Sequence, residues 1–232
     1  MARPIEDITP FTLLDYARYP SAIVWFCGCN MRCGYCYNPE IVHSRGQLTS
    51  ADALEFFHGR RQLLKGVVLS GGEPTLYRRL HHFAKELKAM GYKIKLDTNG
   101  TRPEVIKRLL QSDLLDFVSL DFKADRDSFA QVTKMPAKAY YEVTQTLGVL
   151  LGSEIDFEVR TTVHEQVLDA RAVQNIIADL AKMGYDKTFF VQDFLDGADT
   201  IDGLEAAAKP YDTVSIIQAA NKNGIAVNFR NF

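Results

Sequence analysis

The sequence predicts an α/β protein built around a parallel sheet. Short apolar runs rich in β-branched and aromatic residues alternate with longer amphipathic runs along the chain. Turn residues bound the short runs, and capping residues bound several of the long ones. Repeated strand and helix units of this kind imply parallel strands joined by right-handed crossovers. The pattern leaves open whether the sheet is doubly wound or rolled into a barrel.

The expected elements follow one another in a regular order. Seven strands are expected, at Ala22–Phe26, Gly66–Ser70, Lys93–Asp97, Phe117–Phe122, Ile155–Thr162, Lys187–Phe194 and Ile225–Phe229. Six helices are expected between them, at Ser50–Leu64, Tyr77–Met90, Pro103–Gln111, Ala137–Leu151, Ala170–Met183 and Tyr211–Asn223. Thr49 or Ser50 is expected to cap the first helix, and Gly91, Gly184 and Gly224 are expected to end three others. No linker interrupts the chain, so we expect one domain over residues 1–232, with its last strand at about 224–232.

Composition limits the classes of partner. Apolar residues make up 47% of the 232 residues and charged residues 24%, which is typical of a globular domain. The net charge of −2 at pH 7 gives no general attraction to nucleic acid or to an anionic membrane. No segment has the apolar length that spans a bilayer, and the first residues lack the pattern of a signal peptide. We therefore expect a cytoplasmic protein with neither a membrane nor a nucleic acid as its partner.

The cysteines point to a soft-metal site. All four lie between positions 27 and 36, whereas a disulfide framework would scatter them along the chain. Cys29, Cys33 and Cys36 have the spacing C-x3-C-x2-C directly after the first expected strand. Thiolates are the usual ligands of iron–sulfur clusters, and three ligands on a four-iron cube leave one iron open. We predict a 4Fe–4S cluster in the loop 27–38.

Two other interpretations of the cysteines are weaker. A structural zinc ion usually takes two ligand pairs separated by a longer stretch, which one compact group of four does not provide. Inert core thiols would not gather in a polar loop that contains glycine. Cys27 differs from the other three because it lies at the strand end, and we expect it to pack in the core rather than to bind metal.

Polar residues follow most of the expected strands. They are the cysteine loop, Ser70–Pro74, Asp97–Gly100, Asp121–Lys123, Arg160–Thr162 and Gln192–Phe194. Ligands of parallel α/β folds gather at the carboxyl ends of the strands, so these segments predict one polar site on one rim. Gln192 and Asp193 are weaker candidates, and His164 is expected to be a surface or packed residue.

These motifs resemble those of a known family. The C-x3-C-x2-C spacing, the aromatic Tyr35 before its last cysteine, and Gly-Gly-Glu-Pro at residues 71–74 are the marks of the radical S-adenosylmethionine (SAM) superfamily. The resemblance runs from about Phe11 to Phe194. Further stretches resemble the glycyl-radical-enzyme activases, above all those of anaerobic ribonucleoside-triphosphate reductases, with pyruvate formate-lyase activases as near relatives. Those stretches are FTLLDY at 11–16, CYNPE at 36–40, LDTNG at 96–100 and LDFK at 120–123. Tyr37 departs from the histidine that these activases usually carry there.

The resemblance implies a fold, two cofactors and a set of binding residues. The fold would be a partial, open β/α barrel, and SAM would chelate the open iron of the cluster. Gly71, Gly72, Glu73 and Pro74 would lie along the methionine part of SAM, with Glu73 or a backbone carbonyl accepting from its ammonium group. Tyr35 would lie near the adenine, and Asp97 and Asp121 near the SAM carboxylate, where family members can hold a monovalent cation. Lys123 and Arg160 would face the carboxylate or the ribose, and Asn38, Thr98 and Asn99 complete the expected cofactor-binding set.

The resemblance also implies the reaction and the partners. A glycine of a glycyl radical enzyme, above all anaerobic ribonucleotide reductase, would lose a hydrogen atom, and a flavodoxin- or ferredoxin-type protein would supply the electron. No side-chain acid or base is expected to be catalytic. A radical SAM enzyme acting on a small molecule or a tRNA base has the same cluster and fold, so it stays open. A ferredoxin-like carrier, with Cys27 as the fourth ligand, and a zinc-stabilised interaction module are the alternatives that are not enzymes.

Overall fold

A computed structural model describes residues 2–194, 199–205 and 210–232, and within them it confirms the expected α/β class. One eight-stranded sheet runs in the order β1-β2-β3-β4-β5-β6-β7-β8. Its strands are β1 (Ile5–Thr12), β2 (Ser21–Phe26), β3 (Gly66–Gly71), β4 (Lys93–Thr98), β5 (Phe117–Asp121), β6 (Asp156–Val163), β7 (Phe189–Asp193) and β8 (Val227–Arg230). All neighbours from β2 to β8 are parallel, and β1 is antiparallel to β2.

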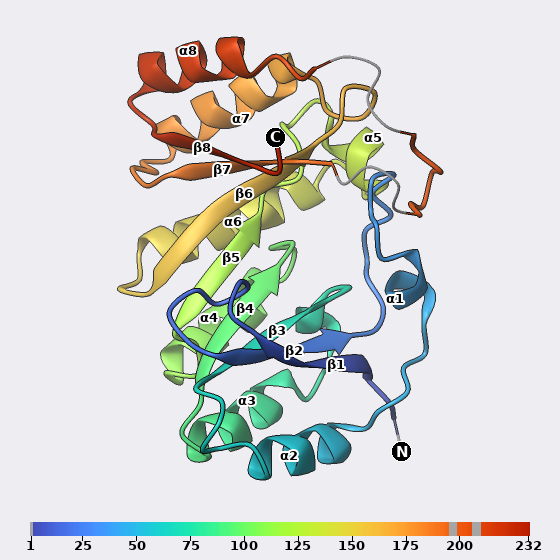
Figure 1. The fold of residues 1–232 in the computed structure, drawn as a ribbon. Helices are drawn as coiled ribbons and strands as arrows, with labels where there is room; N and C mark the ends of the chain where they lie inside the picture. Colours follow the sequence, from blue (N-terminus) through green and yellow to red (C-terminus); the bar gives the residue numbers. More distant parts are fainter. Residues whose placement is uncertain (1, 195–198, 206–209) are drawn as a thin grey trace.

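The sheet is curved but not closed. β1 and β8 are its two ends, and no pairing joins them among the described residues. Figure 1 shows the sheet turning from β1 and β2 at one end to β7 and β8 at the other. The expected partial, open barrel is therefore confirmed.

The helices include longer ones that cover the outer, convex face of the sheet and short ones that lie beside the ends of its strands (Figure 1). They are α1 (Pro39–His43), α2 (Ser50–His58), α3 (Leu80–Ala89), α4 (Pro103–Gln111), α5 (Phe129–Thr133), α6 (Ala139–Leu151), α7 (Ala170–Lys182) and α8 (Thr213–Asn223), with a 3-10 turn η1 (Pro74–Leu76). In α3, the buried residues Leu80, Phe83 and Leu87 recur at the spacing of one helical face. No helix among the described residues combines the length and the apolar character that crossing a bilayer needs.

The expected capping residues mark one helix start and three helix ends. Thr49 and Asp52 form a reciprocal capping box at the start of α2, and the glycines that follow α3, α7 and α8 all have the left-handed backbone that ends a helix. The expected helix Ser50–Leu64 is shorter in the structure because α2 ends at His58, before Gly59. The short helices α1 and α5 were not predicted, since five residues are too few to show a period.

Strand β1 was also not predicted. It is an edge strand with Pro10 inside it, and only its two end residues, Ile5 and Thr12, are buried. Such a strand shows no clear alternation of apolar and polar residues, so the sequence signal is absent.

The loop after β1 folds back over the concave face of the sheet. Tyr16 of this loop packs against Ile23 of β2 and Val68 of β3, with Tyr19 and Phe117 beside them. This small apolar cluster fills the part of the concave face farther from the carboxyl ends of the strands. Polar residues line the part at the carboxyl ends.

At the rim formed by the amino ends of the strands, one partly buried acid joins neighbouring elements. The carboxylate of Asp116, just before β5, accepts hydrogen bonds from the backbone N–H of Ile94 at 2.8 Å, from Lys88 at 3.0 Å and from Lys93 at 2.9 Å. Burial alone would raise the pKa of Asp116, but these hydrogen bonds outweigh it and hold the pKa below its ordinary value.

We expect Asp116→Asn to destabilise the fold without changing the polar residues at the carboxyl ends of the strands. The amide keeps the shape but loses the charge-assisted bonds, so the free energy of unfolding at neutral pH should fall by about 1–3 kcal/mol. Because the folded pKa is lowered, this stabilisation is complete above the unfolded pKa of about 3.9 and is lost as the pH falls through the folded value. Denaturant titrations of the cluster-free chain should show the two proteins converging at acidic pH. An equal difference at every pH would contradict this account.

Candidate functional site

One cavity lies at the carboxyl ends of the parallel strands. Its walls come from Asp15, Trp25, Cys29, Met31, Cys33, Tyr35, Cys36, Tyr37, Asn38, Val42, Ser70, Gly71, Gly72, Asp97, Thr98, Asn99, Asp121, Lys123, Arg160, Thr162, Gln192, Asp193 and Asn231. Asp15 follows β1 and Asn231 follows β8, so both edges of the open sheet contribute to the walls. Of the residues predicted to hold the cluster or SAM, all but Glu73 and Pro74 therefore line one cavity.

The cysteine loop lies along one wall of this cavity. Gly28 begins the loop with φ +79°, a conformation that suits glycine, and its N–H donates to the carbonyl of Ile41. The N–H of Arg32 donates to the carbonyl of Thr133 at 2.9 Å, which ties the middle of the loop to α5. The loop is therefore anchored at both its entry and its middle.

Three of the four thiols share the cavity. Cys29, Cys33 and Cys36 line it, whereas the thiol of Cys27 lies 3.6 Å from the carbonyl oxygen of Arg3, outside the lining. Cys27 is half-buried rather than packed in the core, so that expectation was wrong. Its separation from the other thiols gives no support to a site that uses all four.

The thiols need a positive partner to ionise. Burial raises the pKa of Cys29 to about 11 and that of Cys33 to about 12. The backbone N–H of Met31 and the side-chain amide of Asn99 donate to the Cys29 sulfur, at 3.4 and 3.8 Å. Soft sulfur ligands with N–H donors beside them fit an iron–sulfur cluster, whose charge would hold them as thiolates.

The spacing of these ligands differs from that of a single-ion site. Among the described residues, no three Cys, His, Asp or Glu side chains converge closely enough to hold one metal ion. The thiolates of a four-iron cube bind separate irons and need not meet at one point. This arrangement therefore gives no support to a structural zinc ion.

The Gly-Gly-Glu-Pro turn is pressed against the start of the cysteine loop. The N–H of Gly72 donates to Phe26 at 2.8 Å, and the N–H of Glu73 donates to Gly28 at 2.9 Å. A Cβ added at Gly72 would lie 2.0 Å from the Gly28 carbonyl oxygen, which is backbone and cannot swing away. Here glycine is required by the approach of protein backbone, in addition to any ligand.

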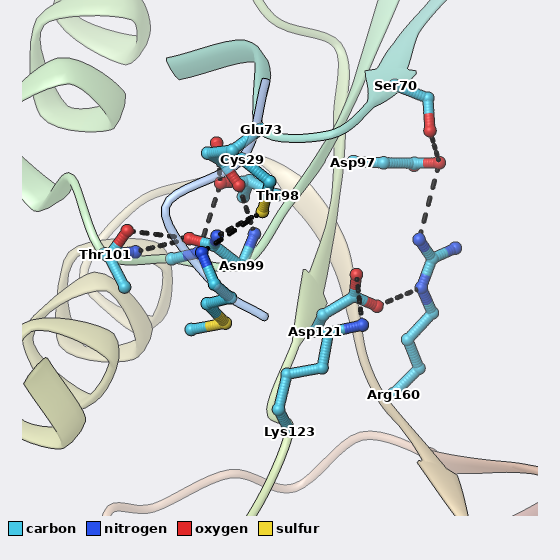
Figure 2. Close-up of polar contacts among 12 residues, drawn as sticks. Cys29, Ser70, Glu73, Asp97, Thr98, Asn99, Thr101, Asp121, Lys123 and Arg160 are labelled. Atoms are coloured by element: carbon cyan, nitrogen blue, oxygen red, sulfur yellow. Dashed lines mark hydrogen bonds and ion pairs between the residues drawn. The ribbon is translucent and has the colours of Figure 1, made fainter. Parts of the chain in front are cut away.

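Glu73 is turned into the protein and away from the cavity. It is 1% exposed, and its carboxylate accepts from the N–H of Thr75 at 3.0 Å, from the hydroxyl of Thr98 at 2.8 Å and from the N–H of Asn99 at 2.7 Å. Burial raises the pKa of Glu73 although these donors favour the ionised form. Figure 2 shows this carboxylate among Cys29, Thr98 and Asn99. Pro74 is also buried, as the first residue of η1.

A second polar group lies across the cavity, on β4, β5 and β6. Arg160 lies 2.6 Å from Asp121 and 3.4 Å from Asp97, and Lys123 lies 3.2 Å from Asp121 (Figure 2). Burial alone would raise the pKa of Asp121, but Arg160 and Lys123 lower it to about 2. The pKa of Asp97 is also lowered, by Lys95 and Arg160 against the effect of burial. Both aspartates are therefore anions that already have cationic partners.

Strand periodicity explains why these charges face inward. β6 alternates along its length, with Phe157, Val159 and Val163 buried under the helices. Glu158 and Arg160 fall on the other, concave face. In β4 the same alternation puts Lys95 and Asp97 on the concave face.

The aromatic residues differ in their exposure. Tyr35 is buried, with its ring 5.8 Å from the Lys123 ammonium and its hydroxyl without a hydrogen-bond partner in the structure. Tyr37 is exposed and lines the cavity, as does Asn38 at the start of α1. A buried, unpaired hydroxyl beside an open cavity is a donor that a polar ligand can satisfy.

Sequence reasoning missed Lys95, Asn30 and Thr101. Asn30 accepts from Asn99 at 2.9 Å and donates to Thr101 at 2.8 Å, and so links the cysteine loop to the end of β4. Lys95 could have been found, because a lysine two residues before Asp97 in a buried strand must share its face. His164 is packed, as expected, against Phe194.

The monovalent cation expected near Asp97 and Asp121 gains no support from the structure. Each of these carboxylates has a lysine and the shared Arg160 within 3.4 Å, so protein cations occupy the positions around their oxygens.

Comparisons with known proteins show the family of the chain. A sequence model described as "Radical SAM superfamily" matches residues 23–165. The "Putative glycyl-radical enzyme activating enzyme MJ1227" of Methanocaldococcus jannaschii is 31% identical over 179 residues, which are 74% of this chain and 73% of that protein. A 7-carboxy-7-deazaguanine synthase of Aquifex aeolicus is 33% identical over 82 residues, covering 35% of this chain and 37% of that protein.

Solved structures share the fold at low identity. The structure titled "Native anSMEcpe with bound AdoMet" has a TM-score of 0.63 and 18% identity, covering 88% of this chain and 61% of that chain. Streptococcus suis SuiB bound to its precursor peptide SuiA has a TM-score of 0.64 and 14% identity, covering 90% of this chain. The chain spans only 47% of the length of SuiB.

We expect Gly72→Ala to displace the cysteine loop. The added methyl group meets the backbone of Gly28, so the iron bound per chain after anaerobic reconstitution should fall by about tenfold. Gly148→Ala is the matched control, because a Cβ at this helical position meets nothing within 4 Å. The control should bind iron normally and be unchanged or slightly more stable. Normal iron content in Gly72→Ala would contradict the described contact.

Proposed function

Because the chain belongs to the radical SAM superfamily, we propose that it is a glycyl-radical-enzyme activase. In this reaction one electron and one SAM convert a glycine of the partner into a glycyl radical, with methionine and 5′-deoxyadenosine as the other products. A flavodoxin- or ferredoxin-type protein would supply the electron. The partner proposed is an anaerobic ribonucleotide reductase, on the resemblance of residues 11–16, 36–40, 96–100 and 120–123.

The observation that carries the proposal is the match, along most of both chains, to a relative named for this activity. The open sheet supports it. The cavity is bordered by Asp15 at one sheet edge and Asn231 at the other, and no strand pairing closes the gap between β1 and β8 among the described residues. A glycine carried on a loop of a large protein needs such a lateral opening.

The residues that line the cavity fit both the iron–sulfur cluster and SAM. Cys29, Cys33 and Cys36 would hold the cluster by three irons, and the N–H donors of Met31 and Asn99 would stabilise the charge on one sulfur. When bound, the cluster and SAM supply a one-electron cleavage of a carbon–sulfur bond and the removal of one hydrogen atom. The protein would hold the reacting groups in position and exclude water from them.

The other residues would orient SAM. Arg160 and Lys123 are the cations in position to pair with its carboxylate, and Tyr35 offers a ring and an unpaired hydroxyl on the same side. Gly71 and Gly72 place backbone at the cavity wall. Glu73, turned inward, would act by holding Thr98 and Asn99 in place.

A radical SAM enzyme acting on a small molecule is the second candidate. The similarity to the Aquifex aeolicus synthase supports this second candidate within the segment that the two chains share. A ferredoxin-like carrier is less well supported, because Cys27 lies outside the cavity that the other thiols share.

The ligand assignment predicts a contrast between two thiols in one loop. Cys33→Ala should lower cluster content by at least about tenfold, as removal of a ligand costs more than removal of its outer partners. Cys27→Ala, the matched control, should keep its iron and sulfide. Electron spin resonance of the reduced proteins should show a change on adding SAM in the wild type and in Cys27→Ala. Loss of the cluster in Cys27→Ala would overturn the ligand set.

The activase assignment is tested with the partner. Reduced, reconstituted protein, SAM and an anaerobic ribonucleotide reductase should give a glycyl-radical signal by electron spin resonance. A reductase with its radical glycine changed to alanine is the control that should give none. SAM cleavage without a glycyl radical, for this and for a pyruvate formate-lyase partner, would favour the small-molecule candidate.

A further inference from the structure

Three protein cations surround two aspartates on the concave face of the half-barrel. Asp97 and Asp121 face three protein cations, Lys95, Lys123 and Arg160, at distances of 2.6–3.4 Å. Their side chains are mostly buried, so solvent screens these charges little.

Lys95 is the cation in this group that no part of the proposed SAM site requires. It lies in the middle of β4 and is 5% exposed. Lysine is almost never so buried unless it is paired. Its ammonium group lies 3.0 Å from Asp97 and donates to the backbone carbonyl of Asp15 at 2.7 Å.

The partners of this ammonium group are those that a hard metal cation would take. A carboxylate oxygen of Asp97 and a carbonyl oxygen of Asp15 are both typical ligands of such ions. The other oxygen of Asp97 accepts from Ser70 at 3.1 Å and faces Arg160. Asp97 Oδ1 accepts no hydrogen bond in the structure, so the ion pair with Lys95 is what balances the charge on this oxygen.

We propose that Lys95 is the built-in counter-cation of Asp97, and that it allows this chain to bind SAM without a monovalent metal ion. Lys95 is thus a positioning residue that acts through Asp97. The inference rests on the proposed SAM site, but it does not depend on which enzyme or small molecule is the radical's target.

The first test needs no variant. SAM binding to the reconstituted wild-type protein is measured at equal ionic strength in potassium chloride, sodium chloride and tetramethylammonium chloride, whose cation is too large for the site. The dissociation constant should agree within about twofold in the three salts. A wild-type affinity that falls by about tenfold in tetramethylammonium chloride would overturn the proposal.

The second test removes the ammonium group. Lys95→Met leaves Asp97 short of a cation, so SAM should bind at least about tenfold more weakly in tetramethylammonium chloride and recover in potassium or sodium chloride. Lys93→Met is the matched control on the same strand, since Lys93 is half exposed and pairs with Asp116 at the other rim. It should show no response to the salt. A folded Lys95→Met protein with equal affinity in all salts would also overturn the proposal.

A readout without SAM separates this inference from the proposed function. Metal ions that bind beside Asp97 stabilise the folded chain, so sodium or potassium should raise the unfolding temperature of cluster-free Lys95→Met above its value in tetramethylammonium chloride. The wild type and the double variant Lys95→Met/Asp97→Asn, which has no charge at either position, should not respond. If the protein bound no SAM in any salt, the SAM site would fail, and this thermal comparison would still decide the role of Lys95.

Discussion

The hydrogen bonds of the buried Glu73 hold the site together. Its carboxylate binds Thr75 after β3 and Thr98 and Asn99 at the end of β4, while its own N–H binds Gly28 at the start of the cysteine loop. One residue thus ties together three neighbouring strand ends. A buried carboxylate costs much free energy unless it is fully bonded, so these donors keep their positions. The cysteine loop rests on a wall that cannot shift independently of the sheet.

Opposite that wall, the site depends on balance among charges. The concave faces of β4, β5 and β6 carry a connected set of acids and bases, from Lys95 and Asp97 through Arg160 to Asp121 and Lys123. In a region of low polarisability each member stabilises the charge of the next. The two walls differ in chemistry. Backbone groups and cysteine sulfurs form the first wall, and charged side chains form the second. Such a division suits a ligand that has a sulfonium centre at one place and a carboxylate at another.

Sequence patterns predicted the parallel strands, the helix ends and the rim residues because each depends on local periodicity or on one capping residue. They missed β1, whose edge position leaves it little buried surface, and α1 and α5, which are too short to show a period. They placed Glu73 beside a ligand, whereas the structure turns it inward. That difference lies in contacts with Thr98 and Asn99, 25 and 26 residues away in sequence, which no local pattern records. The pairing of Lys95 with the Asp15 carbonyl is likewise set by how the loop after β1 folds over the sheet.

Among the described residues β1 and β8 do not pair with each other, and this bears on the size of the opening between them. In a complete barrel, strand number and shear fix the radius, because every strand has two neighbours. The sheet of this protein is an arc, so no closure condition fixes its radius. The twist between each pair of neighbouring strands adds up along the sheet. The distance between the outer strands is therefore set by the twist between neighbouring strands and not by closure of a barrel.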